Sequence, residues 1–315
     1  MKLYIKLNQH RLFRHWQDLL PKGYSDLQPL LKSLQGSPNA LDYHANVEAG
    51  EILTQQSERL FYKQAPLKKL VTGLYYGNDT CEHLLPSPEQ LTSVVDACLQ
   101  AHLRLVLVLP PLTAHNQAAM EALFPCLPSD AEVVVNDWGA LALVQAQEGI
   151  KPLAGRLFHR VQRSAFVDEL QPTDASPEQL AQQQHLRLLP EYSDPTFRAA
   201  FKEMGIGRVA LDNDNHLLDW CEEAPRLHLD IYYPYRYLSL ARACDTAAHY
   251  DARHGHFPLT SCPRYCEKTA VSLPSDTHRH LLQRNNAFYK LALPLDLPSA
   301  VTRNKRNRLI WEPML

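Results

Sequence analysis

Residues 70–109, LVTGLYYGNDTCEHLLPSPEQLTSVVDACLQAHLRLVLVL, contain the pattern that decides the fold. The stretch begins with a β-rich apolar run, Leu70–Tyr76, and ends with a second one, Leu105–Leu109. Between them, Ser87 is a suitable N-cap, and apolar residues recur with helical spacing from Pro88 to Gln100, which predicts a helix. A strand, a helix and a second strand, with nearly continuous apolar strands, indicate a parallel sheet that is buried on both faces.

The same alternation continues along the chain. Further β-rich runs occur at Glu132–Val135, Leu153–Phe158, Arg208–Leu211 and Leu227–Tyr233. Crossovers between parallel strands are right-handed, so the fold is either a doubly wound sheet or a barrel. Because six such units follow one another without a Gly-rich nucleotide-binding turn, we predict an α/β fold of the (β/α) barrel, TIM-like type, complete or partial, with a small C-terminal β tail.

Three regions divide the chain. Residues 1–66 contain a short alternating strand and helical pieces, which we expect to supply the first barrel unit or an N-terminal extension. Residues 67–275 are the predicted β/α barrel that carries the cysteines. Residues 276–315 are the predicted β tail, with strands at Ala287–Leu293 and Arg308–Trp311.

The composition excludes several classes of protein. The 32 Lys and Arg residues nearly balance the 34 Asp and Glu residues, which leaves a formal charge of −2. A nonspecific nucleic-acid coat or a polybasic membrane anchor needs a clear cationic excess. Residues 1–7 lack the apolar centre of a secretory signal, and the most apolar run, Leu103–Leu112, is too short to span a bilayer. We therefore expect a cytoplasmic protein with no membrane insertion.

Four cysteines are the most informative residues of the sequence. Cys262 and Cys266 form a C-P-R-Y-C pair in a turn-rich segment, Cys244 precedes them, and Cys81 follows the strand that ends near Tyr76. Residues that follow parallel strands meet at one end of a barrel. The pattern therefore predicts that four thiolates converge at the barrel mouth.

The spacing leaves the nature of this group open. Four thiolates suit a [4Fe–4S] cluster or structural zinc. One wide pair with two remote ligands favours a cluster over zinc, and unrelated buried thiols are the third alternative. We interpret Cys98, Cys126 and Cys221 as buried thiols without a ligand role.

Several phrases of the chain resemble the U32 peptidase family (the collagenase-like family), and most closely its shorter UbiV-type iron–sulfur members. The resemblance extends over about residues 70 to 310. The matching phrases are Leu74–Gly77 followed by Cys81, then Val133–Gly139, then Leu153–Leu157, and finally Tyr232–Tyr235 leading to Cys244, Cys262 and Cys266.

The resemblance carries specific expectations. It implies a barrel-like fold with a [4Fe–4S] cluster bound by Cys81, Cys244, Cys262 and Cys266. UbiV-type proteins work with a homologous UbiU-type subunit in the oxygen-independent hydroxylation of the ubiquinone ring, which implies a partner and a small aromatic substrate for this chain. Other relatives hydroxylate bases in RNA.

Three further residues are candidates for substrate contact. Asn136 and Asp137 close a buried strand, where they either cap the following helix or contact a substrate. Arg156 lies in an apolar strand, and a buried arginine requires a partner. That partner is either Asp137 or an anionic ligand.

Two other functions stay open, and one is not expected. The basic turn Arg303–Arg308 suits contact with RNA phosphates, and a zinc-stabilised scaffold without catalysis is the second alternative. The chain contains no G-x-S-x-G, H-E-x-x-H or P-loop motif, so we do not expect peptidase activity. The sequence identifies no catalytic residue.

Overall fold

A computed structural model describes most of the chain. The described residues are 1–13, 40–158, 176–179, 182, 191–213, 227–241, 244–250, 262–267, 271–273 and 281–313. Among the described helices, none has the length and apolar character that crossing a bilayer requires.

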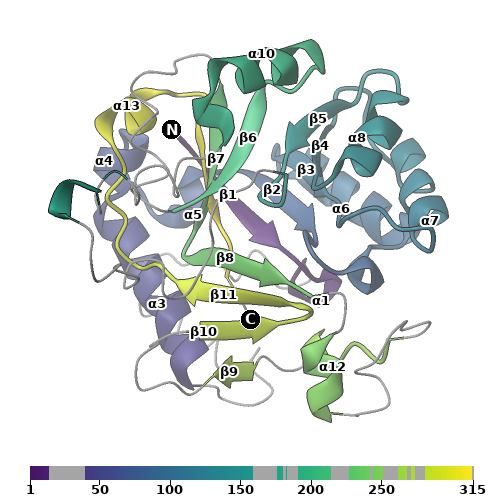
Figure 1. Cartoon of the computed structure of the whole chain (residues 1–315), viewed down its shortest axis with the longest axis horizontal. Helices are drawn as coiled ribbons and strands as arrows, with labels where there is room; N and C mark the ends of the chain where they lie inside the picture. Colours follow the sequence, from purple (N-terminus) through teal and green to yellow (C-terminus); the bar gives the residue numbers. More distant parts are fainter. Residues whose placement is uncertain are drawn as a thin grey trace.

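Eight parallel strands of the described chain form a closed barrel, with helices around it (Figure 1). Going around the barrel, the order is β1-β12-β7-β6-β5-β4-β3-β2. The strands are β1 (Lys2–Leu7), β2 (Val71–Gly77), β3 (Arg104–Val108), β4 (Glu132–Val135), β5 (Lys151–Ala154), β6 (Arg208–Asp212), β7 (His228–Tyr233) and β12 (Arg308–Trp311). The predicted (β/α) barrel is confirmed.

Along each barrel strand, successive side chains point alternately into the barrel interior and out toward the surrounding helices. Tyr4, Val134 and Ile310 belong to an apolar cluster inside the barrel. Their neighbours in sequence, such as Leu3 and Leu309, belong to the larger core between the strands and the surrounding helices. Residues two positions away from an inward residue along a strand therefore also face the barrel interior.

Helices cover the outside of the barrel and begin at local signals. Ser87 caps α6 with a reciprocal capping box, in which its Oγ accepts the N–H of Gln90 and the side chain of Gln90 accepts the N–H of Ser87. The described helices are α1 (His10–Phe13), α3 (Ala40–Gln55), α4 (Ser57–Phe61), α5 (Leu67–Leu70), α6 (Pro88–Gln100), α7 (Gln117–Glu121), α8 (Trp138–Gln145), α10 (Pro195–Glu203), α12 (Asp245–Tyr250) and α13 (Ser299–Arg303). Four short 3₁₀ turns are also described: η1 (Glu82–Leu84), η2 (Phe124–Cys126), η3 (Glu191–Ser193) and η5 (Tyr265–Glu267).

A second, antiparallel sheet is inserted between the last two barrel strands. Its strands lie in the order β8-β11-β10-β9, below the barrel in the view of Figure 1. They are β8 (Tyr235–Leu240), β9 (Val271–Leu273), β10 (Leu281–Arg284) and β11 (Ala287–Leu291). The chain leaves the barrel after β7, builds this sheet and returns as β12.

The two ends of the chain therefore meet in the barrel. β1 pairs with β12 on one side and with β2 on the other, so residues 2–7 provide the first barrel strand. Of the two strands expected in the tail, the one predicted at Ala287–Leu293 is observed as β11 (Ala287–Leu291) and lies in the small sheet. The other, Arg308–Trp311, pairs with both β1 and β7 and closes the barrel.

Candidate functional site

The loop after β2 places Cys81 at the end of the barrel. β2 ends at Gly77, whose φ of 121° and whose close approach to Val108 both require glycine, since a Cβ would lie 2.2 Å from the Val108 carbonyl oxygen. Asn78 Oδ1 then accepts the backbone N–H groups of Thr80 at 2.9 Å and Cys81 at 2.8 Å. This Asx turn fixes the backbone that presents the buried Cys81 thiol.

Cys262 and Cys266 lie in one tight turn. Between them, Arg264 adopts a left-handed conformation with φ of 56°. Cys266 is buried in η5, and its carbonyl oxygen accepts a hydrogen bond from Gln9 Nε2 at 3.0 Å. Cys262 is half-buried, and its Sγ accepts the N–H of Arg264 at 3.4 Å.

Cys244 lies between β8 and α12. The thiol is buried, and its Sγ accepts the N–H of Ala247 at 3.4 Å. Helix α12 packs against η5 and β10, which brings the segment of Cys244 beside that of Cys266.

The four thiols lie within electrostatic reach of one another. Cys81 and Cys266 pack in one small apolar cluster. Burial raises the pKa of Cys81, and Cys266, Cys244 and Cys262 each raise it further. Burial also raises the pKa of Cys266 to about 12. The described cysteines are free thiols, so the fold brings together four distant cysteines that are not joined by disulfides.

These thiols do not yet form a coordination shell. Among the described residues, no three His, Cys, Asp or Glu side chains stand in the arrangement of a formed metal site. Cys81, Cys244 and Cys262 each receive a backbone N–H from two or three residues further along the chain, and for Cys81 the His83 N–H partly offsets the rise in pKa that burial causes. A metal would have to displace the thiol protons and draw the sulfurs together.

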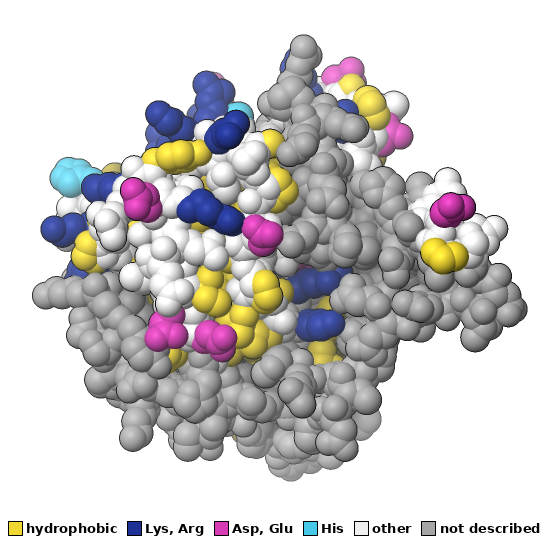
Figure 2. Space-filling view, turned by 90° about the vertical axis from the view of Figure 1, so that its left-hand side faces the viewer, with side chains coloured by type: hydrophobic (Ala, Val, Ile, Leu, Met, Phe, Trp, Pro, Cys, Tyr) yellow, Lys and Arg dark blue, Asp and Glu magenta, His cyan; other side chains and the backbone are white. Residues whose placement is uncertain are grey.

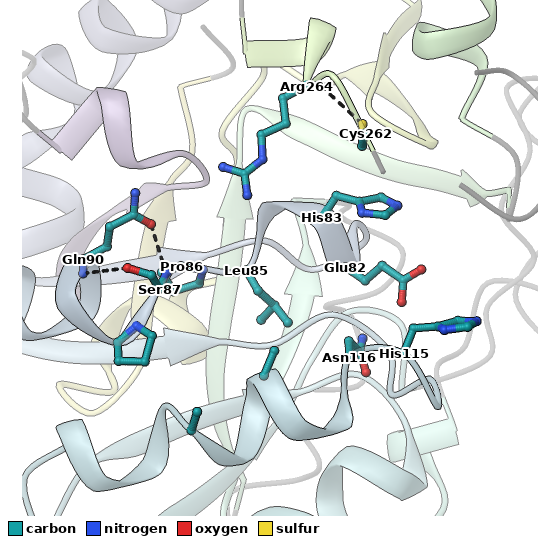
Figure 3. Close-up of a pocket in the computed structure, with 13 residues that line it drawn as sticks. Glu82, His83, Leu85, Pro86, Ser87, Gln90, His115, Asn116, Cys262 and Arg264 are labelled. Atoms are coloured by element: carbon teal, nitrogen blue, oxygen red, sulfur yellow. Dashed lines mark hydrogen bonds between the residues drawn. The ribbon is translucent and has the colours of Figure 1, made fainter. Parts of the chain in front are cut away.

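A hollow of about 750 Å³ opens beside Cys262 (Figure 3). The loops after β2 and β3 line it, together with the turn that carries Cys262 and Arg264. In Figure 3, Arg264 extends toward the hollow, and Glu82, His83 and His115 lie on the side below Cys262. A volume of this size accommodates a small organic molecule.

A network of buried charged side chains lies inside the barrel, at the end where the strands finish and the cysteine loop begins. Arg156 donates from Nη2 to Asp79 at 2.9 Å and Glu312 at 2.8 Å, and from Nη1 to Asp212 at 3.2 Å. Lys6 pairs with Asp79 and, at 2.8 Å, with Glu312. These five side chains are 1–2% exposed. We call them the upper ion cluster.

Mutual attraction holds the upper ion cluster in its charged form. Burial alone would lower the pKa of Arg156, but Glu312, Asp79 and Asp212 hold it well above its ordinary value. Burial alone would raise the pKa of Asp79, but Lys6 and Arg156 outweigh it and hold that pKa at about 2. The Arg156 guanidinium also lies 4.0 Å from the ring centre of Tyr232.

Of the two partners predicted for Arg156, Asp137 or an anionic ligand, Asp137 is wrong, because its carboxylate accepts backbone N–H groups instead. Its Oδ1 accepts the N–H of Ala140 at 2.8 Å as the N-cap of α8, and its Oδ2 accepts the N–H of Leu112 at 2.5 Å. Of the two roles predicted for Asp137, the structure places it in the capping role.

The Asn136 side chain forms hydrogen bonds with the backbone of two neighbouring loops. Its Nδ2 donates to the Leu109 carbonyl oxygen at 2.8 Å, and its Oδ1 accepts the N–H of Leu157 at 3.2 Å. Gly155 is required beside it, because a Cβ there would lie 2.1 Å from Asn136 Oδ1. Asn136 therefore shapes the loop that carries Arg156 into the barrel.

The sequence interpretation missed the partners of Arg156. Lys6 lies two residues after the inward-facing Tyr4, and Glu312 lies two residues after the inward-facing Ile310. Counting every second residue along these strands would have placed both charges inside the barrel. Asp79 offered no such signal, because it lies in a loop.

The fold and this site define a (β/α) barrel with a cysteine-rich mouth. No protein-family model matches the sequence, and no curated protein matches it. Among solved structures, the chain is similar to one described as a U32 peptidase, with a TM-score of 0.41 and 9% sequence identity. That match covers 99% of this chain and 92% of the other.

Proposed function

We propose that this protein binds a [4Fe–4S] cluster through Cys81, Cys244, Cys262 and Cys266. We further propose that it takes part in the oxygen-independent hydroxylation of a small aromatic molecule together with a partner subunit, as UbiV-type proteins do. The observation that carries the proposal is the meeting of four chain-distant thiols at one barrel mouth. The hydroxylation and the partner rest on the sequence resemblance.

The chemistry of the donor set fits an iron–sulfur cluster. Four sulfur donors are the usual ligands of such a cluster, and soft thiolates suit iron–sulfur and zinc centres better than hard cations. Three of the four thiols are buried, which limits access of water and oxygen to the site. When bound, the cluster would supply one-electron transfer.

The residues around the thiols have roles of their own. Asp79 lies two residues before Cys81 and is held by Lys6 and Arg156, so the Cys81 loop is anchored to the barrel interior. The hollow beside Cys262 is where a small molecule would bind, and an anionic group there would meet the Arg264 guanidinium, which pairs with Glu267 at 3.5 Å.

The geometry favours this function over RNA modification. Arg303, Lys305 and Arg306 are exposed, and Figure 2, which views the side of α13, shows Lys and Arg side chains along one edge of that face. Arg308 is instead buried and pairs with Glu132 at 2.6 Å. The turn precedes β12 and lies at the strand starts, whereas the cysteines lie at the opposite end of the barrel.

Anaerobic reconstitution with iron and sulfide tests the proposal. We expect about four iron atoms per chain, visible absorption, and a paramagnetic signal on reduction. Cys81→Ala should lose most of the iron, whereas the matched control Cys98→Ala, which removes a buried thiol from the apolar face of α6, should keep it.

Two results would contradict the proposed site of four cysteines and a [4Fe–4S] cluster. A colourless wild-type protein with about one zinc per chain would instead support the zinc-stabilised scaffold. Iron content that is unchanged by Cys81→Ala would remove Cys81 from the site.

A further inference from the structure

The turn between β10 and β11 is short and buried. Arg284 pairs with Ala287 across the hairpin, so Asn285 and Asn286 alone form the loop. Asn285 adopts a left-handed conformation with φ of 57°, which asparagine tolerates better than most residues. Arg284 and Asn285 are each 1% exposed, which is unusual for a hairpin tip.

The turn is bonded to the segment of Cys81 and to the segment of Cys244. Asn286 Nδ2 donates to the carbonyl oxygen of Thr80, the residue before Cys81, at 3.0 Å. The same Nδ2 donates to the carbonyl oxygen of Ala241 at 3.0 Å, and the N–H of Ala241 donates to the Asn286 carbonyl oxygen at 2.8 Å. On the other side of Cys244, Thr246 Oγ1 donates to the Asn285 carbonyl oxygen at 2.9 Å.

The turn is also bonded to the segment of Cys266. Arg284 Nη2 donates to the Cys266 carbonyl oxygen at 3.3 Å, beside the hydrogen bond that Gln9 makes to the same oxygen. Three consecutive residues of one hairpin tip therefore hydrogen-bond to three cysteine-bearing segments, Arg284 and Asn286 through backbone carbonyl oxygens and Asn285 through the Thr246 hydroxyl.

We propose that residues 284–286 are a positioning clamp that assembles the cysteine site. The segments of Cys81, Cys244 and Cys266 are far apart in sequence, and holding them together costs conformational entropy. A rigid hairpin bonded to all three offsets that cost and keeps the sulfurs close in the metal-free chain. The inference rests on the proposed function only for the kind of metal that these thiols receive.

Asn286→Ala is the main test, and Asn213→Ala is its matched control. Asn213 Nδ2 also donates to two backbone carbonyl oxygens, those of Ala292 at 3.1 Å and Pro294 at 2.7 Å. In both residues the side-chain oxygen is buried without a hydrogen-bond partner among the described residues. The two variants therefore remove equivalent interactions, one that ties cysteine-bearing segments together and one that does not.

The first readout is thiol proximity in the metal-free, full-length chain. Dibromobimane becomes fluorescent when it joins two neighbouring thiols, and a Cys98→Ala, Cys126→Ala, Cys221→Ala background leaves only the four site cysteines. We expect Asn286→Ala, which removes two hydrogen bonds, to slow the cross-linking by more than about fivefold, the factor that corresponds to one ordinary hydrogen bond. Asn213→Ala should leave the rate unchanged, although both variants lower the melting temperature.

The second readout is the loss of iron from the reconstituted protein to a chelator. Asn286→Ala should release iron faster than both the wild type and Asn213→Ala. Thr246→Val removes the single hydrogen bond from Thr246 Oγ1 to the Asn285 carbonyl oxygen and keeps the side-chain volume. It should change both readouts in the same direction by a smaller factor. It provides the test if Asn286→Ala does not fold.

The outcomes separate the clamp from the proposed function. If the wild type takes up no iron but its cross-linking depends on Asn286, the cluster fails and the clamp stands. If the wild type binds iron and both readouts are the same in Asn286→Ala, Thr246→Val and Asn213→Ala, the clamp is wrong and the cluster stands.

Discussion

The two ends of the barrel interior are both charged, but they differ in their access to water. At the strand starts, Arg308 pairs with Glu132 at 2.6 Å and Arg208 pairs with Asp230 at 2.6 Å. In this lower ion cluster, made of Glu132, Arg208, Asp230 and Arg308, Glu132 is 16% exposed and Arg208 is 9% exposed, whereas Arg308 is 4% and Asp230 is 1% exposed. The side chains of the upper ion cluster are 1–2% exposed.

The difference indicates that the two clusters have different roles. Buried ion pairs contribute little net stability, but removing one partner leaves an uncompensated charge. In (β/α) barrels, the end where strands begin serves stability, and the end where strands finish carries function. The lower ion cluster closes the barrel, whereas the upper ion cluster reaches the cysteine loop through Asp79.

Replacing Arg156 should have the largest effect. Arg156→Met removes the cation that Asp79, Asp212 and Glu312 share. Lys6 then remains to pair with Asp79 and Glu312 only, and water does not reach these carboxylates. We expect the free energy of unfolding to fall by about 3–5 kcal/mol, measured by urea denaturation of the metal-free chain. A loss below about 1 kcal/mol would mean that the upper ion cluster rearranges freely.

Replacing Arg308 should cost less. Arg308→Met removes the partner that pairs with Glu132 at 2.6 Å, but Glu132 is partly in contact with water. Arg208 still pairs with Asp230 in this variant. We expect a loss of about 2–3 kcal/mol in the same assay. A loss equal to that of Arg156→Met would contradict the comparison, because it would show that exposure makes no difference.

Acid should act on the upper ion cluster through Asp79. Its pKa is about 2 in the folded chain and 3.8 as an ordinary carboxyl group, so its stabilising contribution is present above pH 3.8 and is lost as the pH falls toward 2. The contribution is on the order of 2 kcal/mol. Unfolding free energies of wild type and Asp79→Asn, measured from pH 6 to pH 2, should converge as the pH falls. Parallel curves would contradict the prediction.

The smallest effect should come from Asp137, which caps α8 and bonds to backbone N–H groups rather than to the upper ion cluster. Asp137→Ala removes the N-cap of α8 and should cost about 1 kcal/mol. Asp194→Ala, at the N-cap of α10, is a matched control of similar cost. Iron content after reconstitution should be unchanged in both. Loss of iron in Asp137→Ala alone would give Asp137 a role beyond capping.

The secondary structure was predictable because its causes are local. The helix predicted from Pro88 to Gln100 has those bounds in the structure, since its capping box and apolar stripe lie within thirteen residues of chain. The barrel strands appeared as apolar runs of four to seven residues, and the observed strands lie within a few residues of them. The cysteines that the fold brings together were also recognisable from residue type and position.

The sequence alone therefore determined the order of the barrel strands β2 to β7, the barrel class and the four candidate ligands, because each follows from short-range pattern or from donor chemistry. It did not predict β8, β9 and β10 of the small sheet. Only the tertiary structure decided that β12 lies between β1 and β7. It also decided that Arg156 pairs with Asp79, Asp212 and Glu312 rather than with Asp137. The hydrogen bonds from residues 284–286 to three cysteine-bearing segments are likewise visible only in the tertiary structure. These contacts join residues that are far apart in the chain. Which distant groups meet depends on closing the whole barrel, and no local preference encodes that.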